Sequence, residues 1–590
     1  MLRRILELSI CLAACGSAVK ANPYPDVKLH PGYSLTTIRP VSFEPQVSGL
    51  AFLPNGDLLV LTWRGDQGPR GPDNTSTGTA VPTVGIRDGE GKLYRLTNVK
   101  GSDRTAIKVT QVAGGLKDPM GLCVVGNDVY VGDIDRVVKM VDADGDGKYE
   151  STFEVGKLPS YNGWFEYSFG PVYKDGKLYM ALAAGVAATG VPIMQLGMDR
   201  SSVVSLPIGG GKYSVVAEGL RAPDGIGLGP EDEIFVTDNQ GGWRPANQIQ
   251  HIVQDRFYGY MVEPKGAIQI KTNAAVTPPA IWLPYIEANE SPTEPSLMKA
   301  GTYAGQLIYG DISHGGIYRA FLEKVGGEYQ GAVFLFTGGL EVGVHRLRTG
   351  PNGEIYFGGL GNGMDNNQGW NGTKYGLQKL VPNGKEVMEI LAVRSRAKGM
   401  ELEFTMPVGV EAETKENYVI QQWGYIPTAD YGGPKQSVQS RIVKSVQISP
   451  DRKKVFLEMD GLKTGQVVAI QVNNVKSQAD AQALWYSKAW YTLNAISPSQ
   501  PFETSSAAKP SAGALAPARL KAERLTNGIR VLLPDAGEYK ITLLDFQGRS
   551  VTAEVTAIGH GYIATGGLQP GLHLIRASGS GKFLTLPIVL

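Results

Sequence analysis

One pattern recurs along the first two thirds of the chain and constrains its fold more than any other feature. A typical copy has a glycine near its start, alternating apolar residues, a turn that contains Gly, Pro, Asp or Asn, and a second strand that ends in a small or polar residue. Clear copies begin at Gly49, Gly121, Phe169, Gly225 and Leu347, and a looser copy begins at Gly305. Turn dipeptides such as Asn55-Gly56 and Asn352-Gly353 are strong hairpin signals. Six such units between about residues 40 and 385 predict a six-bladed β-propeller, whose loops at one end of the channel build a site.

The composition supports an all-β chain. The 590 residues include 76 glycines, nearly twice the usual share, and glycine supplies the positive φ angles of tight turns. Long amphipathic helical periods are absent from the sequence. The 57 basic and 56 acidic residues create no overall field that would attract nucleic acid or an anionic membrane.

The blade pattern stops after Val381, and three further segments follow. Residues 388–495 alternate apolar and polar side chains, which predicts an immunoglobulin-like β-sandwich. Residues 496–519 are rich in Ser, Pro and Ala and are predicted to be a linker. Residues 520–590 are predicted to form a small C-terminal β-sandwich. The predicted fold class is therefore all-β, with the propeller over residues 22–387.

The first 21 residues are predicted to be an export signal. Arg3 and Arg4 precede a short apolar run that ends in small residues. Cleavage after Ala21 would release a secreted or cell-surface protein, whereas lipidation of Cys15 would leave a periplasmic lipoprotein. No other stretch is apolar enough to predict a transmembrane segment. Beyond the signal only Cys123 remains, so disulfides are not expected to stabilise the fold.

Common catalytic and metal-binding motifs are missing from the sequence. It contains no GxSxG, HExxH, Walker loop or CxxCH, which disfavours serine hydrolases, zinc proteases, NTPases and covalent c-type haem. Residues 142–147 match the start of a calcium loop, but Phe153 occupies the twelfth position, where an EF-hand needs Glu. An acidic hairpin tip and a weak Ca²⁺ site are both compatible with this segment.

Three stretches resemble the glucose/sorbosone dehydrogenase superfamily, which includes soluble quinoproteins. They are residues 119–150 (PMGLCVVGNDVYVGDIDRVVKMVDADGDGKYE), 220–260 (LRAPDGIGLGPEDEIFVTDNQGGWRPANQIQHIVQDRFYGY) and 343–361 (GVHRLRTGPNGEIYFGGLG). The resemblance covers about residues 30–495. It implies pyrroloquinoline quinone (PQQ) at the propeller mouth, with its carboxylates clamped by cationic side chains. It also implies a Ca²⁺ that polarises the quinone and a histidine base that acts on a sugar hydroxyl.

The resemblance assigns candidate site residues one by one. The cofactor-binding candidates are Arg221, Asp224, Arg346 and Arg348, and the metal candidates are Asp238, Asn239 and Gln240. Arg346 and Arg348 alternate on one strand and point to one face, which is also the pattern of a solvated strand face.

The position of the family's catalytic histidine falls on Phe165. Phenylalanine cannot accept a proton, so the remaining candidates for a base are Glu166, His314 and His345. A lone histidine is also commonly a structural hydrogen-bonding residue.

The end of the chain resembles the C-terminal sorting domains of type IX secretion. The resemblance rests on residues 537–549 (GEYKITLLDFQGR) and 566–576 (GGLQPGLHLIR), and it implies the secretion machinery as a partner.

Two functions therefore stay open. The first is PQQ-dependent oxidation of a sugar or a polysaccharide-derived small molecule, with electrons passed to an external acceptor. The second is a redox-inactive propeller that acts as a carbohydrate-binding or cell-surface interaction module.

Overall fold

The structure is a computed structural model, and its first compact unit comprises residues 1–503, its second residues 504–590. In the first unit it describes residues 28–63, 91–160, 166–184, 199–261, 276–313, 315–360 and 375–502. In the second it describes residues 521–525, 528–533, 538–545, 550–552, 555–558, 560–564, 572–579 and 582–589. No helix in these ranges is long and apolar enough to cross a membrane. Helix in the described residues is limited to short 3₁₀ turns, so the predicted all-β class is confirmed.

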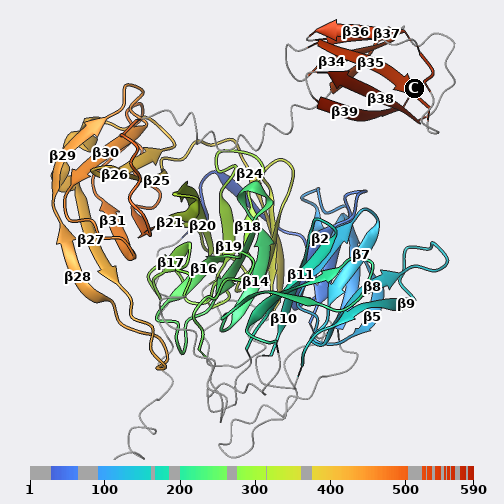
Figure 1. Cartoon of the computed structure of the whole chain (residues 1–590), viewed down its shortest axis with the longest axis horizontal. Coiled ribbons are helices and arrows are strands. Elements are labelled where there is room, and N and C mark those ends of the chain that lie inside the picture. Colours follow the sequence, from blue (N-terminus) through green and yellow to red (C-terminus); the bar gives the residue numbers. More distant parts are fainter. Residues whose placement is uncertain are drawn as a thin grey trace, which may run out of the picture. The chain divides into compact units, whose positions relative to one another are not determined.

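Six groups of four strands make the propeller (Figure 1). The first blade contains β2 (Val47–Phe52), β3 (Leu58–Thr62), β4 (Gly91–Thr97) and β5 (Lys108–Leu116). The second contains β6 (Leu122–Val125), β7 (Asp128–Gly132), β8 (Arg136–Val141) and β9 (Ser151–Lys157). The third contains β10 (Ser168–Lys174), β11 (Lys177–Leu182), β12 (Ser202–Pro207) and β13 (Ser214–Glu218).

The next three blades repeat the same order. The fourth contains β14 (Pro223–Leu228), β15 (Ile234–Asp238), β16 (Asn247–His251) and β17 (Ile281–Leu283). The fifth contains β18 (Ser296–Leu297), β19 (Leu307–Gly310), β20 (Ile317–Val325) and β21 (Glu328–Thr337). The sixth contains β22 (Arg346–Thr349), β23 (Ile355–Gly359), β24 (Gly376–Pro382) and, from the start of the chain, β1 (Tyr33–Thr37).

Pairing of β1 with β24 closes the ring. Tyr33 lies opposite Pro382 and Thr37 opposite Gln378, so the N-terminal strand is the outer strand of the last blade. The inner strands β2, β6, β10, β14, β18 and β22 contact one another in that cyclic order. They approach closely: a Cβ atom added to Gly225 would lie 2.2 Å from Cα of Glu294 in the next blade. The predicted six-bladed propeller is confirmed.

The strands after the propeller form a β-sandwich that shares a sheet with the fifth blade. One sheet contains β25 (Ile390–Arg396), β26 (Gly399–Phe404), β30 (Lys454–Met459) and β29 (Val443–Ile448). The other contains β32 (Lys488–Leu493), β31 (Gln466–Val472), β27 (Tyr418–Gly424) and β28 (Gln436–Arg441). Pairing of β21 with β32 joins this second sheet to the fifth blade and gives one sheet of eight strands.

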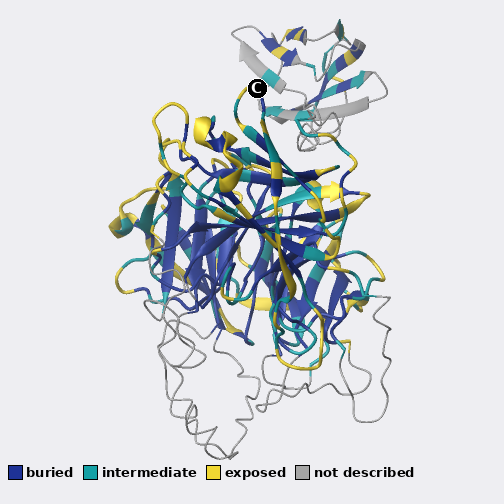
Figure 2. Ribbon diagram, turned by 90° about the vertical axis from the view of Figure 1, so that its left-hand side faces the viewer, coloured by how far each residue is buried: buried dark blue, intermediate teal, exposed yellow. Residues whose placement is uncertain are grey.

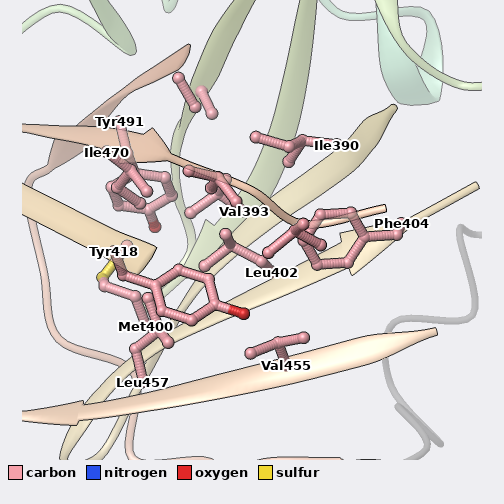
Figure 3. Close-up of a cluster of buried hydrophobic side chains, with 14 of the residues drawn as sticks. Ile390, Val393, Met400, Leu402, Phe404, Tyr418, Val455, Leu457, Ile470 and Tyr491 are labelled. Carbon is pink, nitrogen blue, oxygen red and sulfur yellow. The ribbon is translucent and has the colours of Figure 1, made fainter. Parts of the chain in front are cut away.

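Each sheet buries an apolar face. Figure 3 shows side chains of the sandwich core, such as Val393, Leu402 and Ile470, pointing into the space between the two sheets. The same core includes Ala332 and Phe334 from blade strand β21. Figure 2 shows buried strands through the propeller, with exposed residues at loops and edges.

The second unit is one seven-stranded sheet in the order β33-β34-β37-β36-β35-β38-β39. The strands are β33 (Lys521–Leu525), β34 (Gly528–Leu532), β35 (Glu538–Leu544), β36 (Val555–Ile558), β37 (His560–Ala564), β38 (Leu572–Gly579) and β39 (Lys582–Val589). Its core includes Ile529, Tyr539, Leu543 and Ile575.

Limited proteolysis is expected to separate the two units. The Ser/Pro/Ala-rich composition of residues 496–519 offers little apolar surface to bury, and the chain divides between residues 503 and 504. A low dose of subtilisin should release a fragment that starts near residue 520, identified by mass spectrometry. First cleavage inside strands of the propeller would contradict this boundary. Residues 497–502 are hydrogen-bonded to the sandwich, for example through Ser497 N to Ser395 Oγ at 3.1 Å, so we expect cleavage after residue 502. Residues 503–520 lie outside the described part of the chain.

Candidate functional site

In each blade the inner strand starts, and the second strand finishes, at the same end of the propeller. We call this end the mouth. It is marked by Asp224 and Arg346 at the starts of β14 and β22, and by Asp133, Asp238 and Asp311 at the ends of β7, β15 and β19. The topology therefore brings several of the predicted site residues to one end.

The three aspartates at the strand ends have the same structural role in their blades, which we call a brace. Each carboxylate accepts backbone N–H groups from the segment that leads into the inner strand of its own blade. Lys117 N donates to Asp133 Oδ1 at 3.1 Å, and Glu290 N donates to Asp311 Oδ2 at 2.8 Å. Ala222 N donates to Asp238 Oδ1 at 2.8 Å. The sequence carries a signal for this brace that the prediction missed, because each aspartate follows a small residue, in VGD, VTD and YGD.

The oxygens of Asp238 are fully used by these hydrogen bonds. Besides Ala222, Arg221 N donates to both carboxylate oxygens at 3.2 and 3.0 Å, and Arg244 Nε donates to Oδ2 at 2.7 Å. Asp238 and Arg244 are both buried. The predicted metal ligand is thus the anionic half of a buried ion pair.

The side chains of the two neighbouring metal candidates also make hydrogen bonds to the protein. Asn239 donates through Nδ2 to the carbonyl oxygen of Ala222 at 3.0 Å and accepts from Ser291 Oγ at 3.0 Å. Gln240 donates through Nε2 to Pro245 O at 3.0 Å.

Arg346 lies at the centre of the ring and contacts several blades. It is 1% exposed, and each of its three guanidinium nitrogens has a protein acceptor. Nε donates to Ser48 O at 3.1 Å, Nη2 to Met120 O at 3.2 Å, and Nη1 to Asp224 O at 3.0 Å. These acceptors belong to the first, second and fourth blades, so the interpretation as a solvated strand face is wrong for Arg346. The guanidinium acts as a buried link between blades.

His345 is held next to this arginine and is also buried. Its Nδ1 lies 3.0 Å from the carbonyl oxygen of Val47, and its Nε2 lies 3.0 Å from Oδ1 of Asp224. Burial, followed by the neighbouring positive charge of Arg346, lowers the pKa of His345. Both ring nitrogens face protein oxygens and the side chain is buried, so neither nitrogen is positioned to reach a substrate hydroxyl in this arrangement.

Arg348 lies one step further along the same strand. Its Nη1 pairs with Glu294 Oε2, and its side chain is 25% exposed. Cys123 lies near this cation, on the inner strand of the second blade, and burial raises the pKa of its thiol to about 12. The thiol is therefore protonated at neutral pH, as expected of a structural cysteine.

Of the three proposed substitutes for the missing base, His345 lies beside Asp224 and Arg346. Glu166 is buried just before β10, at the mouth end of the third blade. Phe165 and His314 lie outside the described residues.

A loop of the β-sandwich reaches the mouth, which the sequence did not predict. The turn between β27 and β28 docks on the loop that joins β15 to β16 (the long hairpin in Figure 1). Trp243 N donates to Thr428 O at 2.6 Å, and Gly432 N donates to Gly241 O at 3.0 Å. The guanidinium carbon of Arg221 lies 5.0 Å from the ring centroid of Tyr431 in this turn. The sandwich therefore supplies part of the mouth wall beside the fourth blade.

Comparisons with known proteins give structural likenesses only. No family model matches the chain, and no curated protein matches it. The PQQ-bound aldose sugar dehydrogenase of Streptomyces coelicolor is 13% identical, with 60% of this chain and 99% of that chain covered and a TM-score of 0.40. The apo-form of the soluble aldose sugar dehydrogenase of Escherichia coli is 14% identical, with coverages of 60% and 100% and a TM-score of 0.40. The calcium structure of a Trichoderma reesei carbohydrate-active enzyme of family AA12 is 13% identical, with coverages of 61% and 98% and a TM-score of 0.42.

The described residues do not fit PQQ and Ca²⁺ as arranged. A tricarboxylate needs free guanidinium or ammonium donors, but all three guanidinium nitrogens of Arg346 bind protein oxygens and Arg348 is paired with Glu294. Among the described cofactor-binding candidates this leaves only Arg221, whose Nη1 donates to Gln240 O, and one guanidinium cannot clamp three carboxylates. Ca²⁺ takes six to eight oxygen ligands, whereas the oxygens of Asp238 already accept four hydrogen bonds.

The acidic turn between β8 and β9 is separate from this site. Asp142, Asp144, Asp146 and Glu150 offer oxygens within 4.8 Å of one another. The Asp142 carboxylate accepts from Gly145 N at 2.7 Å and Gly147 N at 3.0 Å, as in a self-capped acidic hairpin tip.

Asp133 is expected to make stability depend on pH. Burial raises its pKa from 3.8 to about 7, although Arg136 opposes the shift. Between these values the folded carboxyl keeps a proton that the unfolded one has lost, so stability falls as pH rises from about 4 to 7 and then levels off. Asp133→Asn keeps an acceptor for Lys117 N and removes this titration.

We expect the unfolding free energy of Asp133→Asn, relative to wild type, to rise between pH 5 and pH 8 by about 1–3 kcal/mol. Urea unfolding of both proteins at each pH measures this difference. A difference that stays constant over the range would show that Asp133 is ionised throughout.

Proposed function

We propose that this chain is an exported propeller protein that binds carbohydrate at its mouth and does not oxidise it through a quinone. The absence of quinone chemistry is supported by Arg346, because each of its three guanidinium nitrogens donates to a protein oxygen. Arg346 therefore links the inner strands of the ring and does not present its guanidinium to a cofactor. The burial of His345 against Val47 O and Asp224 adds to this support, because a general base must lie within hydrogen-bond reach of the substrate proton.

The mouth still offers groups that suit a neutral, hydroxyl-rich ligand. Arg221 is half-buried and Asp224 is part-exposed, with 14% of its side chain accessible. Tyr431 adds an exposed aromatic ring beside Arg221. Polar side chains next to exposed aromatic rings are the usual composition of a small-molecule site, since rings supply contact area and polar groups fix orientation.

Export remains part of the proposal. The N-terminal signal and the resemblance of the last segment to sorting domains both support a location outside the cytoplasm, at the surface or in the medium. Extracellular polysaccharides and their fragments would then be the available ligands.

Sugar oxidation with PQQ and Ca²⁺ is the second candidate. It is favoured because Arg221, Asp224, Arg346 and Arg348 lie on the segments that start β14 and β22, at one end of the channel. Binding the cofactor there would require Arg346 to give up buried hydrogen bonds that are each worth about 1.5–3 kcal/mol.

Two assays on the mature full-length protein separate the candidates. In affinity electrophoresis through gels that contain xylan, mannan, starch or mixed-linkage β-glucan, we expect at least one polysaccharide to retard the protein. In the second assay, protein incubated with PQQ and Ca²⁺ is expected to reduce no dye acceptor in the presence of glucose, xylose, mannose or maltose. Dye reduction with saturation kinetics would overturn the proposal in favour of the dehydrogenase.

A further inference from the structure

The turn that the sandwich places on the mouth carries an exposed aromatic ring. Tyr431 is 72% exposed although its backbone is fixed, because Tyr431 bridges Gly242 as an antiparallel partner. Gly432 N and Gly433 N donate at 3.0 Å to Gly241 O and Pro245 O of the propeller loop. Single exposed aromatic rings are common on protein surfaces, but this one combines high exposure with a backbone that the propeller loop holds in place.

One face of this ring is covered and the rest is open. The guanidinium of Arg221 lies over the ring at 5.0 Å, and Nη1 of the same side chain donates to Gln240 O at 2.6 Å. The cation therefore orients the tyrosine and leaves most of its surface to solvent. Ring orientation fixed in advance lowers the entropy lost when a ligand stacks on it.

The propeller loop under the turn is strained. Trp243 has φ of +60°, in the left-handed region, yet it is not a glycine. Its N–H is bound to Thr428 O of the sandwich turn at 2.6 Å, so the docked turn helps to hold this conformation. Strain of this kind concentrates at ligand sites, where surrounding contacts enforce it.

The position of the ring relative to the centre of the mouth indicates the size of the ligand. Asp224 lies at the start of β14, and Arg221 precedes it by three residues, on the segment that the Asp238 carboxylate holds in place. The Arg221 side chain continues outward from there to Tyr431. We expect a ligand that touches both Asp224 and Tyr431 to span the Arg221 side chain that lies between them, and therefore to contain more than one sugar ring.

We infer that Tyr431 is a stacking platform supplied by the sandwich, and that the ligand is an oligosaccharide chain running from the propeller mouth across this ring. The inference rests on the proposed function. The C–H face of a sugar ring is electropositive and packs against the negative face of an aromatic ring, while its hydroxyls stay available to polar neighbours such as Gln240. Tyr431 is thus a determinant of chain-length specificity that lies outside the propeller.

Isothermal titration with cello-, xylo-, manno- and malto-oligosaccharides of one to six residues tests this inference. For at least one ladder, we expect the affinity of wild type to rise roughly tenfold between the monosaccharide and the longer members. Tyr431→Ala should remove most of that rise and leave the monosaccharide affinity unchanged, and Tyr431→Phe should keep the rise. Because the side chain is exposed, Tyr431→Ala should unfold at the wild-type temperature.

Tyr173→Ala is the matched control, since Tyr173 is also exposed but lies toward the other end of the inner strand β10. It should bind every ladder as wild type does. Equal losses at all chain lengths in Tyr431→Ala, or no loss at all, would overturn the platform and leave carbohydrate binding intact. No binding of any ladder or polysaccharide by wild type would overturn the proposed function and the inference together, and would favour a protein partner for the exposed ring.

Discussion

Replacing Arg346 by alanine is expected to destabilise the first unit by about 3–5 kcal/mol even when no ligand or cofactor is present. The substitution removes the charge that faces Asp224 and leaves the carbonyl oxygens of Ser48 and Met120 without their donor. Those oxygens belong to different blades, so the loss weakens the ring at several contacts at once. Arg346→Lys should destabilise the unit nearly as much, because one ammonium group cannot reach all the oxygens that the planar guanidinium binds.

Thermal unfolding followed by circular dichroism measures this effect, and we expect the midpoint to fall by at least about 5 °C. Arg348→Ala is the control, because this side chain is 25% exposed and makes an ion pair with a single carboxylate, Glu294. It should cost about 1 kcal/mol or less. If Arg346→Ala unfolded at the wild-type temperature, the arginine would be free for a ligand and the structural account of it would be wrong.

A chain that ends at residue 387 is expected to be insoluble, whereas one that ends at residue 503 should fold. Strand β21 pairs with β32 of the sandwich, and without it would present a long apolar edge. One buried cluster also combines propeller residues Trp282 and Leu335 with sandwich residues Trp423 and Trp490. Exposing each large side chain of this cluster costs about 1.5–3 kcal/mol.

Expression of both chains, followed by gel filtration, provides the measurement. The chain ending at residue 503 keeps the whole first compact unit and should elute as a monodisperse species. A soluble, cooperatively unfolding chain ending at residue 387 would show that the propeller does not need the sandwich.

The propeller could be predicted because its signal is local. Five of the six repeats cover the inner strand and the second strand of a blade, which are joined by a tight turn such as Asp175-Gly176, where Gly176 has φ of +76°. The looser copy at Gly305 covers the second and third strands of its blade, β19 and β20, because the inner strand there is reduced to Ser296–Leu297. The copy at Gly305 therefore does belong to a blade, but it is shifted by one strand relative to the other five copies.

Long-range pairings could not be predicted in the same way. Alternating residues show that 388–495 contains strands, but not that β32 extends the edge of β21 or that β1 completes the last blade. These pairings depend on which edges are left free after the blades have closed. For the same reason, the sequence gives no sign that a sandwich turn would lie on the mouth.

The candidate site was predicted in part. The alternation of Arg346 and Arg348 places both residues on an inner strand, and the structure has them there. The acceptors of Arg346 come from blades far apart in sequence, so its saturation could not be foreseen. By contrast, the role of Asp238 as a brace could have been predicted from the sequence, since Asp133 and Asp311 occupy the same place in their repeats.

The central claim, that this mouth does not hold a quinone, is tested most directly by PQQ retention. Mature full-length protein is incubated with excess PQQ and Ca²⁺, passed through a desalting column, and examined for quinone absorbance against protein concentration. Because Arg346 and Asp238 are occupied by protein partners, we expect no PQQ to remain after desalting. Retention of one PQQ per chain, lost on addition of EGTA, would contradict the account and establish the dehydrogenase site.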